Sequence, residues 1–289
     1  MVRFFNLLYH KRKFSLLFFL NVYTILCSSN CYSQKNFSQQ YNAQVIYELQ
    51  YIPDSNNRKE VKTEYMELLV NDSMSLFRSI NNGILDSILY LDFKNGKEYN
   101  PMLSFLQYRT PFFYNIVKSS NSTFYSEKIG STYFSYQEPM NNFRWMLGSD
   151  TATISGFNCQ KATVHYGNRN WIAWFSKDIP LSNGPYTFGG LPGLIVEIYD
   201  EQNFWHFLLT GIVNKSTTAI INYNKIFGYE VVHKNKLYKE KKYYDENTYE
   251  IMEAQGRFKG VKEENKLRSK TNLKNAAKRN NNWIEPYVE

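Results

Sequence analysis

Apolar and polar residues alternate along much of the chain before residue 234, and this period of two predicts β-strands. Residues 43–52 place Val45, Tyr47 and Leu49 on one strand face. Three pairs of extended runs are joined by short polar turns, at residues 71–72, 167–169 and 200–202. Such pairs are typical of β-hairpins, and repeated hairpins predict an antiparallel sheet.

The remaining segments before residue 234 are less regular. The runs at residues 88–93 and 131–137 suggest short strands, and residues 142–148 suggest a helical turn. Few stretches longer than ten residues show helical spacing before residue 235. We therefore expect a mainly β protein with one large curved antiparallel sheet, half-barrel-like or a sandwich, over residues 34–233.

The last segment, residues 234–289, differs in pattern and in charge. It is charged and offers only a thin apolar stripe, which predicts a helical or partly disordered tail. Residues 234–280 hold 14 Lys or Arg against 7 Asp or Glu, whereas residues 34–233 are nearly neutral. The basic tail predicts a solvated appendage or a contact with an anionic membrane surface. Residues 283–288 are apolar enough to pin its end to the sheet.

The N-terminus has the three parts of a secretory signal peptide, which we assign to residues 1–33. Four bases precede an apolar run, and small polar residues follow it. Cleavage after Ser33 is expected; lipidation at Cys27 or Cys31, or an uncleaved anchor, are the alternatives. We expect the exported protein to be periplasmic, outer-membrane associated or secreted, and export makes nucleic acid an unsuitable partner. Cys159 then remains alone, without a disulfide framework.

The densest glycine cluster of the chain lies at FGGLPGLIVEIYD, residues 188–200. Pro192 and Gly193 suit the two central positions of a type II turn, and Leu194 and Ile195 begin an apolar strand. Gly189, Gly190 and Leu191 precede the turn, and a glycine lets backbones approach closely. The simpler interpretation is a tight, buried turn that leads into a central strand. The alternative is a ligand or a partner protein that contacts the glycine backbone.

This stretch resembles the signature of the GLPGLI family, secreted proteins of Bacteroidota-type bacteria, with the hexapeptide intact at residues 190–195. Residues 154–190 are similar to the segment that precedes the signature in that family, with Cys159, Trp171, Trp174 and Pro185 in the expected places. The resemblance is strong over residues 150–213 and weak elsewhere. It implies export and a β-rich body, and it implies no activity.

Polar constellations for catalysis or metal binding are sparse. Cys159 with His206, or Glu197 with Asp200, would be needed for a hydrolase of unrecognised type. A buried structural thiol is the simpler interpretation of Cys159. Glu197 suits a less buried strand face or a pair with Arg169, Lys161 or Lys177. No motif for a metal, a cofactor or a serine nucleophile is present in the sequence, so we expect none of these.

Aromatic residues are the strongest candidates for binding, since the chain has 24 Tyr, 21 Phe and 5 Trp. They build the core of a large sheet, or some of them line a groove for an apolar, peptide or glycan ligand. The candidate ligand-binding residues are Trp171, Trp174, Tyr186, Phe188 and Trp205. Together these features favour a non-catalytic envelope factor for binding, chaperoning or assembly, with an envelope protein, a peptide or a lipid as partner.

Overall fold

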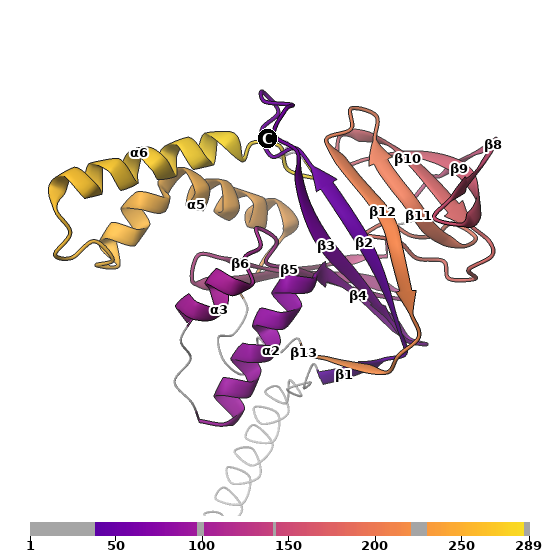
Figure 1. Cartoon of the computed structure of the whole chain (residues 1–289), viewed down its shortest axis with the longest axis horizontal. Helices are drawn as coiled ribbons and strands as arrows, with labels where there is room; N and C mark the ends of the chain where they lie inside the picture. The colour runs from indigo at the N-terminus through magenta and orange to yellow at the C-terminus, as the bar shows by residue number, and fades with distance from the viewer. Residues whose placement is uncertain (1–37, 97–100, 141–142, 221–229, 286–289) are drawn as a thin grey trace, which may run out of the picture. The chain divides into compact units, whose positions relative to one another are not determined.

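The computed structural model describes residues 38–96, 101–140, 143–220 and 230–285. The described residues belong to one compact unit (Figure 1). The assigned signal peptide, with Cys27 and Cys31, lies outside the described residues. In the part of the chain that is described, no helix has the length and apolar character needed to cross a membrane.

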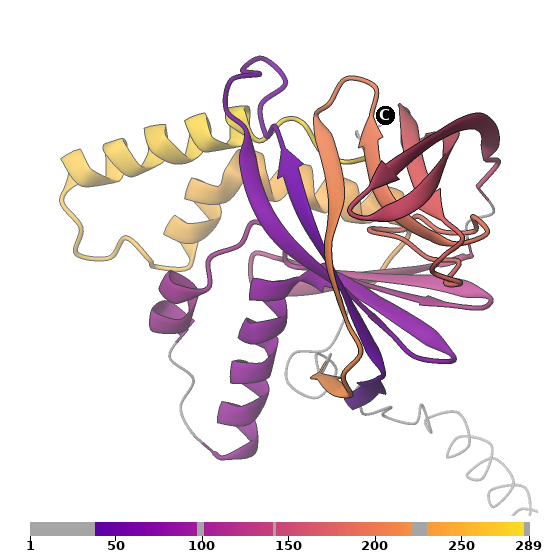
Figure 2. The same cartoon turned by 45° about the vertical axis from the view of Figure 1, so that its right-hand side comes forward.

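One large open sheet dominates the described residues and confirms the mainly β prediction. Its strand order is β14-β7-β6-β5-β4-β3-β2-β12-β11-β10-β9-β8, and every pair is antiparallel except β14 with β7. Figure 2 shows its strong curvature. The strands are β2 Ala43–Tyr51, β3 Lys62–Val70, β4 Met74–Ser79, β5 Tyr114–Ser119, β6 Ser122–Ile129, β7 Thr132–Pro139, β8 Met146–Ile154, β9 Phe157–Tyr166, β10 Arg169–Ser176, β11 Leu194–Asp200, β12 Trp205–Val213 and β14 Glu230–Val231. A separate ribbon pairs β1 Ser38–Tyr41 with β13 Thr217–Ile220.

The three predicted hairpins are present as β3–β4, β9–β10 and β11–β12. Two local predictions are wrong. Residues 88–93, expected as a strand, belong to helix α2, Ile80–Lys94. Residues 146–148, expected in a helical turn, begin β8. The apolar spacing of Ile80, Ile84 and Ile88 is helical, but the aromatic and β-branched residues of this segment suit a strand equally well.

The core lies on the inner face of the curved sheet. Alternate residues of β2 point there, so that Val45, Tyr47 and Leu49 are fully buried. Residues 177–193, the β10–β11 connection, pack on the same face and reach across the sheet. The side-chain amide of Asn183 donates to the Ser75 hydroxyl of β4 at 2.9 Å, and just after the connection the Ile195 carbonyl accepts a hydrogen bond from the Tyr47 hydroxyl of β2 at 2.7 Å. Both halves of the sheet therefore share one core with this connection.

The glycine cluster makes a different turn from the one expected. The Gly193 amide donates to the Leu191 carbonyl at 2.8 Å, which is the pattern of a γ-turn centred on Pro192, and the Leu194 amide bonds to Ile179 instead of closing a type II turn. Gly193 has a φ of +152°, and a Cβ there would lie 2.0 Å from the Ser176 carbonyl oxygen. Gly193 is needed because the connection presses against the end of β10.

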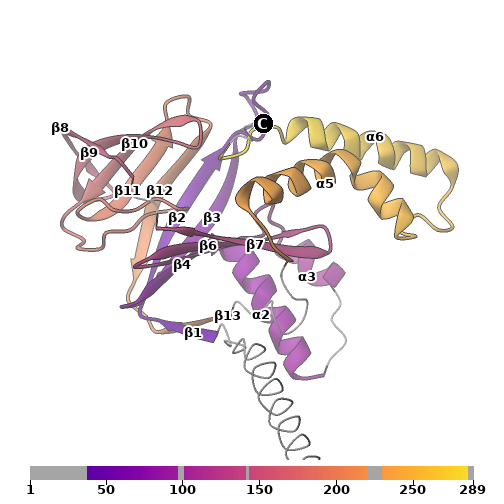
Figure 3. The same ribbon diagram turned by 180° about the vertical axis from the view of Figure 1, so that it is seen from behind.

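Four described helices flank the sheet. Besides α2 they are α3 Pro101–Gln107, α5 Lys234–Ala254 and α6 Glu263–Arg279. Helix α5 contacts β6 and β7 (Figure 3) and buries Leu237 completely, whereas α6 buries no residue. The tail is thus helical, and one of its two helices packs on the sheet. That residues 34–233 fold without the tail stays a prediction.

We predict that Gly193→Ala costs far more stability than Gly189→Ala. At Gly193 a methyl group meets a backbone oxygen and an unfavourable φ, which should lower the free energy of unfolding by more than about 2 kcal/mol. At Gly189 the nearest atom to a new Cβ is 3.5 Å away, so a change below about 1 kcal/mol is expected. Denaturant unfolding of both variants measures the difference, and equal losses would contradict the close approach.

Candidate functional site

A cavity of about 720 Å³ lies where one end of the sheet meets the helices. Strand residues come from β2, β5, β6, β7 and β12, and helical residues come from α2, α3 and α5. Residues Asn280–Glu285, which we term the C-terminal strap, supply a further part of the wall. The cavity is therefore built from segments that are more than 200 residues apart in sequence, and the volume is typical of a small-molecule site.

The floor of the cavity is a chain of aromatic rings. Trp205 stacks on Tyr51 with centroids 5.4 Å apart, and Phe112 meets the Tyr51 ring edge-on at 5.0 Å. Tyr114 stacks on Tyr125 at 5.7 Å. Aromatic contacts of this kind fix the rings in place and leave apolar faces and edges toward a ligand.

Two polar groups in this floor have no hydrogen-bond partner among the described residues. They are the indole Nε1–H of Trp205 and the hydroxyl of Tyr114, and both side chains are at least nine-tenths buried. A buried polar group without a partner costs about 1–3 kcal/mol, so it is rare in a native fold. Because both residues line the cavity, an acceptor entering it would satisfy them.

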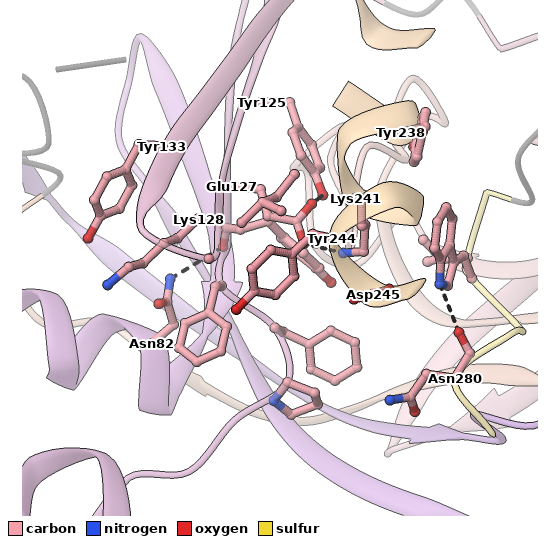
Figure 4. A pocket seen from close by; sticks show the side chains of 18 of the residues that line it. Asn82, Tyr125, Glu127, Lys128, Tyr133, Tyr238, Lys241, Tyr244, Asp245 and Asn280 are labelled. Carbon is pink, nitrogen blue, oxygen red and sulfur yellow. Dashed lines mark hydrogen bonds and ion pairs between the residues drawn. The ribbon is translucent and has the colours of Figure 1, made fainter. Parts of the chain in front are cut away.

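The wall formed by α5 is charged, and its charges are mostly paired. The buried Glu127 accepts a hydrogen bond from the Tyr125 hydroxyl at 2.8 Å and pairs with Lys241 of α5. Burial raises the pKa of Asp245 to about 6, with Lys241 opposing the shift and Glu127 adding to it. Figure 4 shows Lys241, Asp245 and Tyr238 at one end of the cavity.

The opposite end of the cavity is formed by α2 and the end of β6. Figure 4 shows Asn82, Lys128 and Tyr133 there. The Asn82 side chain points toward the strand and donates to the Tyr114 carbonyl at 3.5 Å. Leu85 of α2 and Phe105 of α3 add an apolar wall beside these polar groups. The cavity is therefore amphipathic along its length.

A buried guanidinium holds the C-terminal strap against the sheet. Arg169 donates to the carbonyls of Ile284 at 3.1 Å and Trp283 at 2.8 Å, and to the Asn282 side chain at 2.6 Å. Its remaining bond is an ion pair of 3.1 Å with the buried Asp200. The second oxygen of Asp200 accepts the Trp205 amide at 2.7 Å. One ion pair thus fixes both the strap and the aromatic floor.

The strap also reaches the β10–β11 connection. Glu285 accepts a hydrogen bond from the Tyr186 hydroxyl at 2.5 Å and pairs with Lys234 of α5 at 2.8 Å. Tyr186 lines the cavity and is fully buried. The end of the chain, the start of α5 and the segment before the glycine cluster are therefore tied together at the cavity wall.

A buried lysine of β5 holds the same connection from the sheet side. The Lys118 amine donates to the carbonyls of Gly184 at 2.8 Å and Phe188 at 2.9 Å. Burial lowers the pKa of this amine to about 7. A neutral amine has two N–H groups, and the two carbonyls use both of them. Lys118 therefore acts as a hydrogen-bonding clamp for the connection.

The five aromatic residues proposed from the sequence separate in the structure. Tyr186 and Trp205 line the cavity. Trp171 and Phe188 lie in the core, with centroids 4.8 Å apart. Trp174 is half-buried on β10, opposite Glu197. The other floor residues were missed, because the only signal for them is the high tyrosine and phenylalanine content; they are Tyr51, Phe112, Tyr114 and Tyr125.

The structure does not form the Cys159–His206 pair that the sequence suggested, nor an ion pair between Glu197 and the proposed cations. Burial raises the pKa of Cys159 to about 11, which disfavours the thiolate. Strands β10 and β11 lie between Cys159 and His206 in the sheet order. His206 instead contacts Glu197 at 2.7 Å. Glu197 is half-buried and none of its three proposed cationic partners bonds to it, since Arg169 pairs with Asp200 and Lys161 with Asp150.

The described residues contain no group of three or more His, Cys, Asp or Glu side chains that could hold a metal ion.

Comparison with known proteins gives a short family match. The model of a protein of unknown function, Porph_ging, matches residues 165–197. This range includes β10, the β10–β11 connection and the hexapeptide at residues 190–195. It overlaps the stretch that carries the resemblance to the GLPGLI family. No curated protein matches the chain.

Among solved structures, two of PNGF-II are similar, in the P21 and C2 space groups. Their identities to this chain are 13% and 14%, and their TM-scores are 0.45 and 0.44. The matches cover 70% and 71% of this chain but only 33% and 32% of those chains. This chain thus spans about a third of their length, and a likeness at this TM-score indicates no activity.

We predict that Lys118 makes stability rise with pH above neutrality. Between about pH 7 and 10.5 the unfolded lysine keeps a proton that the folded one has lost. Because the unfolded state then binds more protons, the free energy of unfolding increases with pH in this window. Lys118→Met should remove that slope, whatever its effect at a single pH.

The measurement is denaturant unfolding of both proteins from about pH 7 to about pH 9. The wild type should gain stability relative to Lys118→Met over this range. Lys177→Met, at an exposed lysine of the same connection, serves as the control and should keep the wild-type slope. Parallel pH curves for wild type and Lys118→Met would contradict the neutral clamp.

Proposed function

We propose that this protein is an exported, non-catalytic binding factor of the cell envelope that encloses a small amphipathic ligand in the aromatic cavity. The proposal includes a signal peptide at residues 1–33, membership of the GLPGLI family and a periplasmic, outer-membrane or secreted location. A small amphipathic ligand agrees with the lipid or peptide partner that we expect from the sequence. An apolar body and a carbonyl-type acceptor are the features that the cavity would recognise.

The observation that carries this proposal is the pair of buried polar groups without partners, Trp205 Nε1–H and the Tyr114 hydroxyl. An indole N–H is only a donor, so its partner must supply an acceptor. The rings around it, such as Tyr51 and Phe112, suit an apolar body. An apolar pocket with a few convergent polar groups is the usual form of a ligand site.

A hydrolase remains the alternative, and the geometry gives it little support. Both oxygens of Asp200 are occupied, by Arg169 on one side and by the amides of Phe204 and Trp205 on the other. Cys159 is kept protonated by its raised pKa. A test substrate is monododecanoylglycerol, a neutral lipid that contains an ester bond. A non-catalytic binding protein should leave this ester intact after incubation. Its hydrolysis would favour the enzyme.

We predict that Tyr114→Phe and Tyr125→Phe have different effects on stability, although the two rings are stacked. The Tyr114 hydroxyl has no partner to lose, so its removal should leave the free energy of unfolding unchanged or raise it. The Tyr125 hydroxyl donates to Glu127, so its removal should cost about 1–3 kcal/mol. Denaturant unfolding of the free proteins measures both.

The same variants test binding, with monododecanoylglycerol as the probe in calorimetry. Tyr114→Phe should weaken binding about 2- to 12-fold, the equivalent of one hydrogen bond. The proposal fails if wild-type protein does not bind the probe, or if Tyr114→Phe binds it as tightly as wild type. Equal destabilisation by both substitutions would mean that the Tyr114 hydroxyl is bonded in the free protein.

A further inference from the structure

Two cationic residues line the cavity without an ion pair in the described part of the chain. Lys128 belongs to the end of β6, and Arg257 belongs to the connection between α5 and α6; both are exposed. The Lys128 ammonium lies over the Tyr133 ring at 5.4 Å. Partial burial lowers its pKa; Asp86 opposes that shift, and Arg257 adds to it. The two cations are thus close enough to repel each other.

Several of the other charged residues of the cavity have partners within the protein. Glu127 pairs with Lys241, and Glu285 pairs with Lys234. Asp86 lies 3.7 Å from Arg78, which also bonds to Glu67. Asp245, whose pKa of about 6 leaves it mostly ionised at neutral pH, lies at the end of the cavity opposite Lys128 in Figure 4. Lys128 and Arg257 are therefore the charges of the cavity wall with which an anion would pair.

Apolar surface continues from this end of the cavity onto α3. Phe105 lines the cavity, stacks on Phe113 with centroids 5.8 Å apart, and is 40% exposed. Leu106 beside it is 58% exposed. The cavity thus combines aromatic rings, an apolar opening and two cations. This combination is complementary to an amphiphile with a negatively charged head.

We infer that the ligand is an anionic single-chain amphiphile, whose chain lies against the aromatic rings and whose carboxylate or phosphate head accepts a hydrogen bond from the Tyr114 hydroxyl and pairs with Lys128 and Arg257. This inference rests on the proposed binding function. The volume suits one chain, since pockets of roughly 300–1,000 Å³ enclose a drug-sized molecule. Each methylene that leaves water contributes about 0.8 kcal/mol, so the chain supplies most of the affinity and the head supplies selectivity.

The test compares three probes with twelve-carbon chains: dodecanoate, dodecyl phosphate and the neutral monododecanoylglycerol. Calorimetry with purified wild-type protein should show the anionic probes binding more tightly than the neutral one. The double variant Lys128→Gln/Arg257→Gln should weaken binding of the anionic probes about 3- to 10-fold and leave the neutral probe unchanged, as expected for two exposed charge pairs. Added salt should reduce the wild-type preference.

The matched control is Lys59→Gln/Arg268→Gln, which removes the same charge at two exposed positions that do not line the cavity. It should bind every probe as wild type does. The preferred anionic probe distinguishes a fatty-acid head from a lipid phosphate.

Two outcomes would overturn the inference. Equal affinity for neutral and anionic probes would remove the anionic head and leave the binding function intact. Equal weakening by the control and the Lys128→Gln/Arg257→Gln variant would show only a general charge effect. Failure of all three probes would instead contradict the binding function itself, and so the two failures can be told apart.

Discussion

The cavity depends on one buried ion pair, between Arg169 and Asp200. Arg169 bonds to three residues of the C-terminal strap, and Asp200 bonds to the amides of Phe204 and Trp205 at the start of β12. Loss of either charge would leave the other buried without compensation, which typically costs about 3–5 kcal/mol. The pair thus holds together the start of β12, which carries Trp205 of the aromatic floor, and the wall formed by the C-terminal strap.

The β10–β11 connection is the second element that organises the cavity. It packs on the inner face of the sheet, where Lys118 and Ser75 bond to it from β5 and β4. Its other end is fixed by Gly193, which is pressed against the Ser176 carbonyl. Tyr186 lies between these two points and reaches Glu285 of the strap. The motif that is most conspicuous in the sequence therefore acts as a structural link to the cavity.

The strand pattern made much of the fold predictable, because alternation and short polar turns are local signals. At the β9–β10 turn, Gly167 and Asn168 both have positive φ, as glycine and asparagine allow at a two-residue hairpin turn. Helix α2 was mistaken for a strand in part, since its isoleucines and aromatic residues suit both structures. Tertiary packing decides between them, and the sequence alone does not show that packing.

The candidate site was only partly predictable for the same reason. Trp205 and Tyr186 were selected because they lie in an aromatic-rich stretch. Tyr51 and Tyr114 lie in separate strands, and only the folded sheet brings them together. Lys118 is one lysine in an apolar strand, which gives no sign of its two carbonyl partners. Contacts between distant segments carry the site, and no local pattern encodes them.

The neighbouring residues Tyr114 and Tyr125 differ in hydrogen bonding, and this difference indicates a role for the cavity. Tyr125 has a carboxylate partner, while the Tyr114 hydroxyl beside it has none, although phenylalanine would fill the same space without that cost. A ligand that accepts a hydrogen bond there would recover the free energy lost in the free protein. Since Trp283 and Ile284 of the strap also line the cavity, such a ligand would stabilise the docked strap. By linkage, a docked strap would strengthen ligand binding to the same extent.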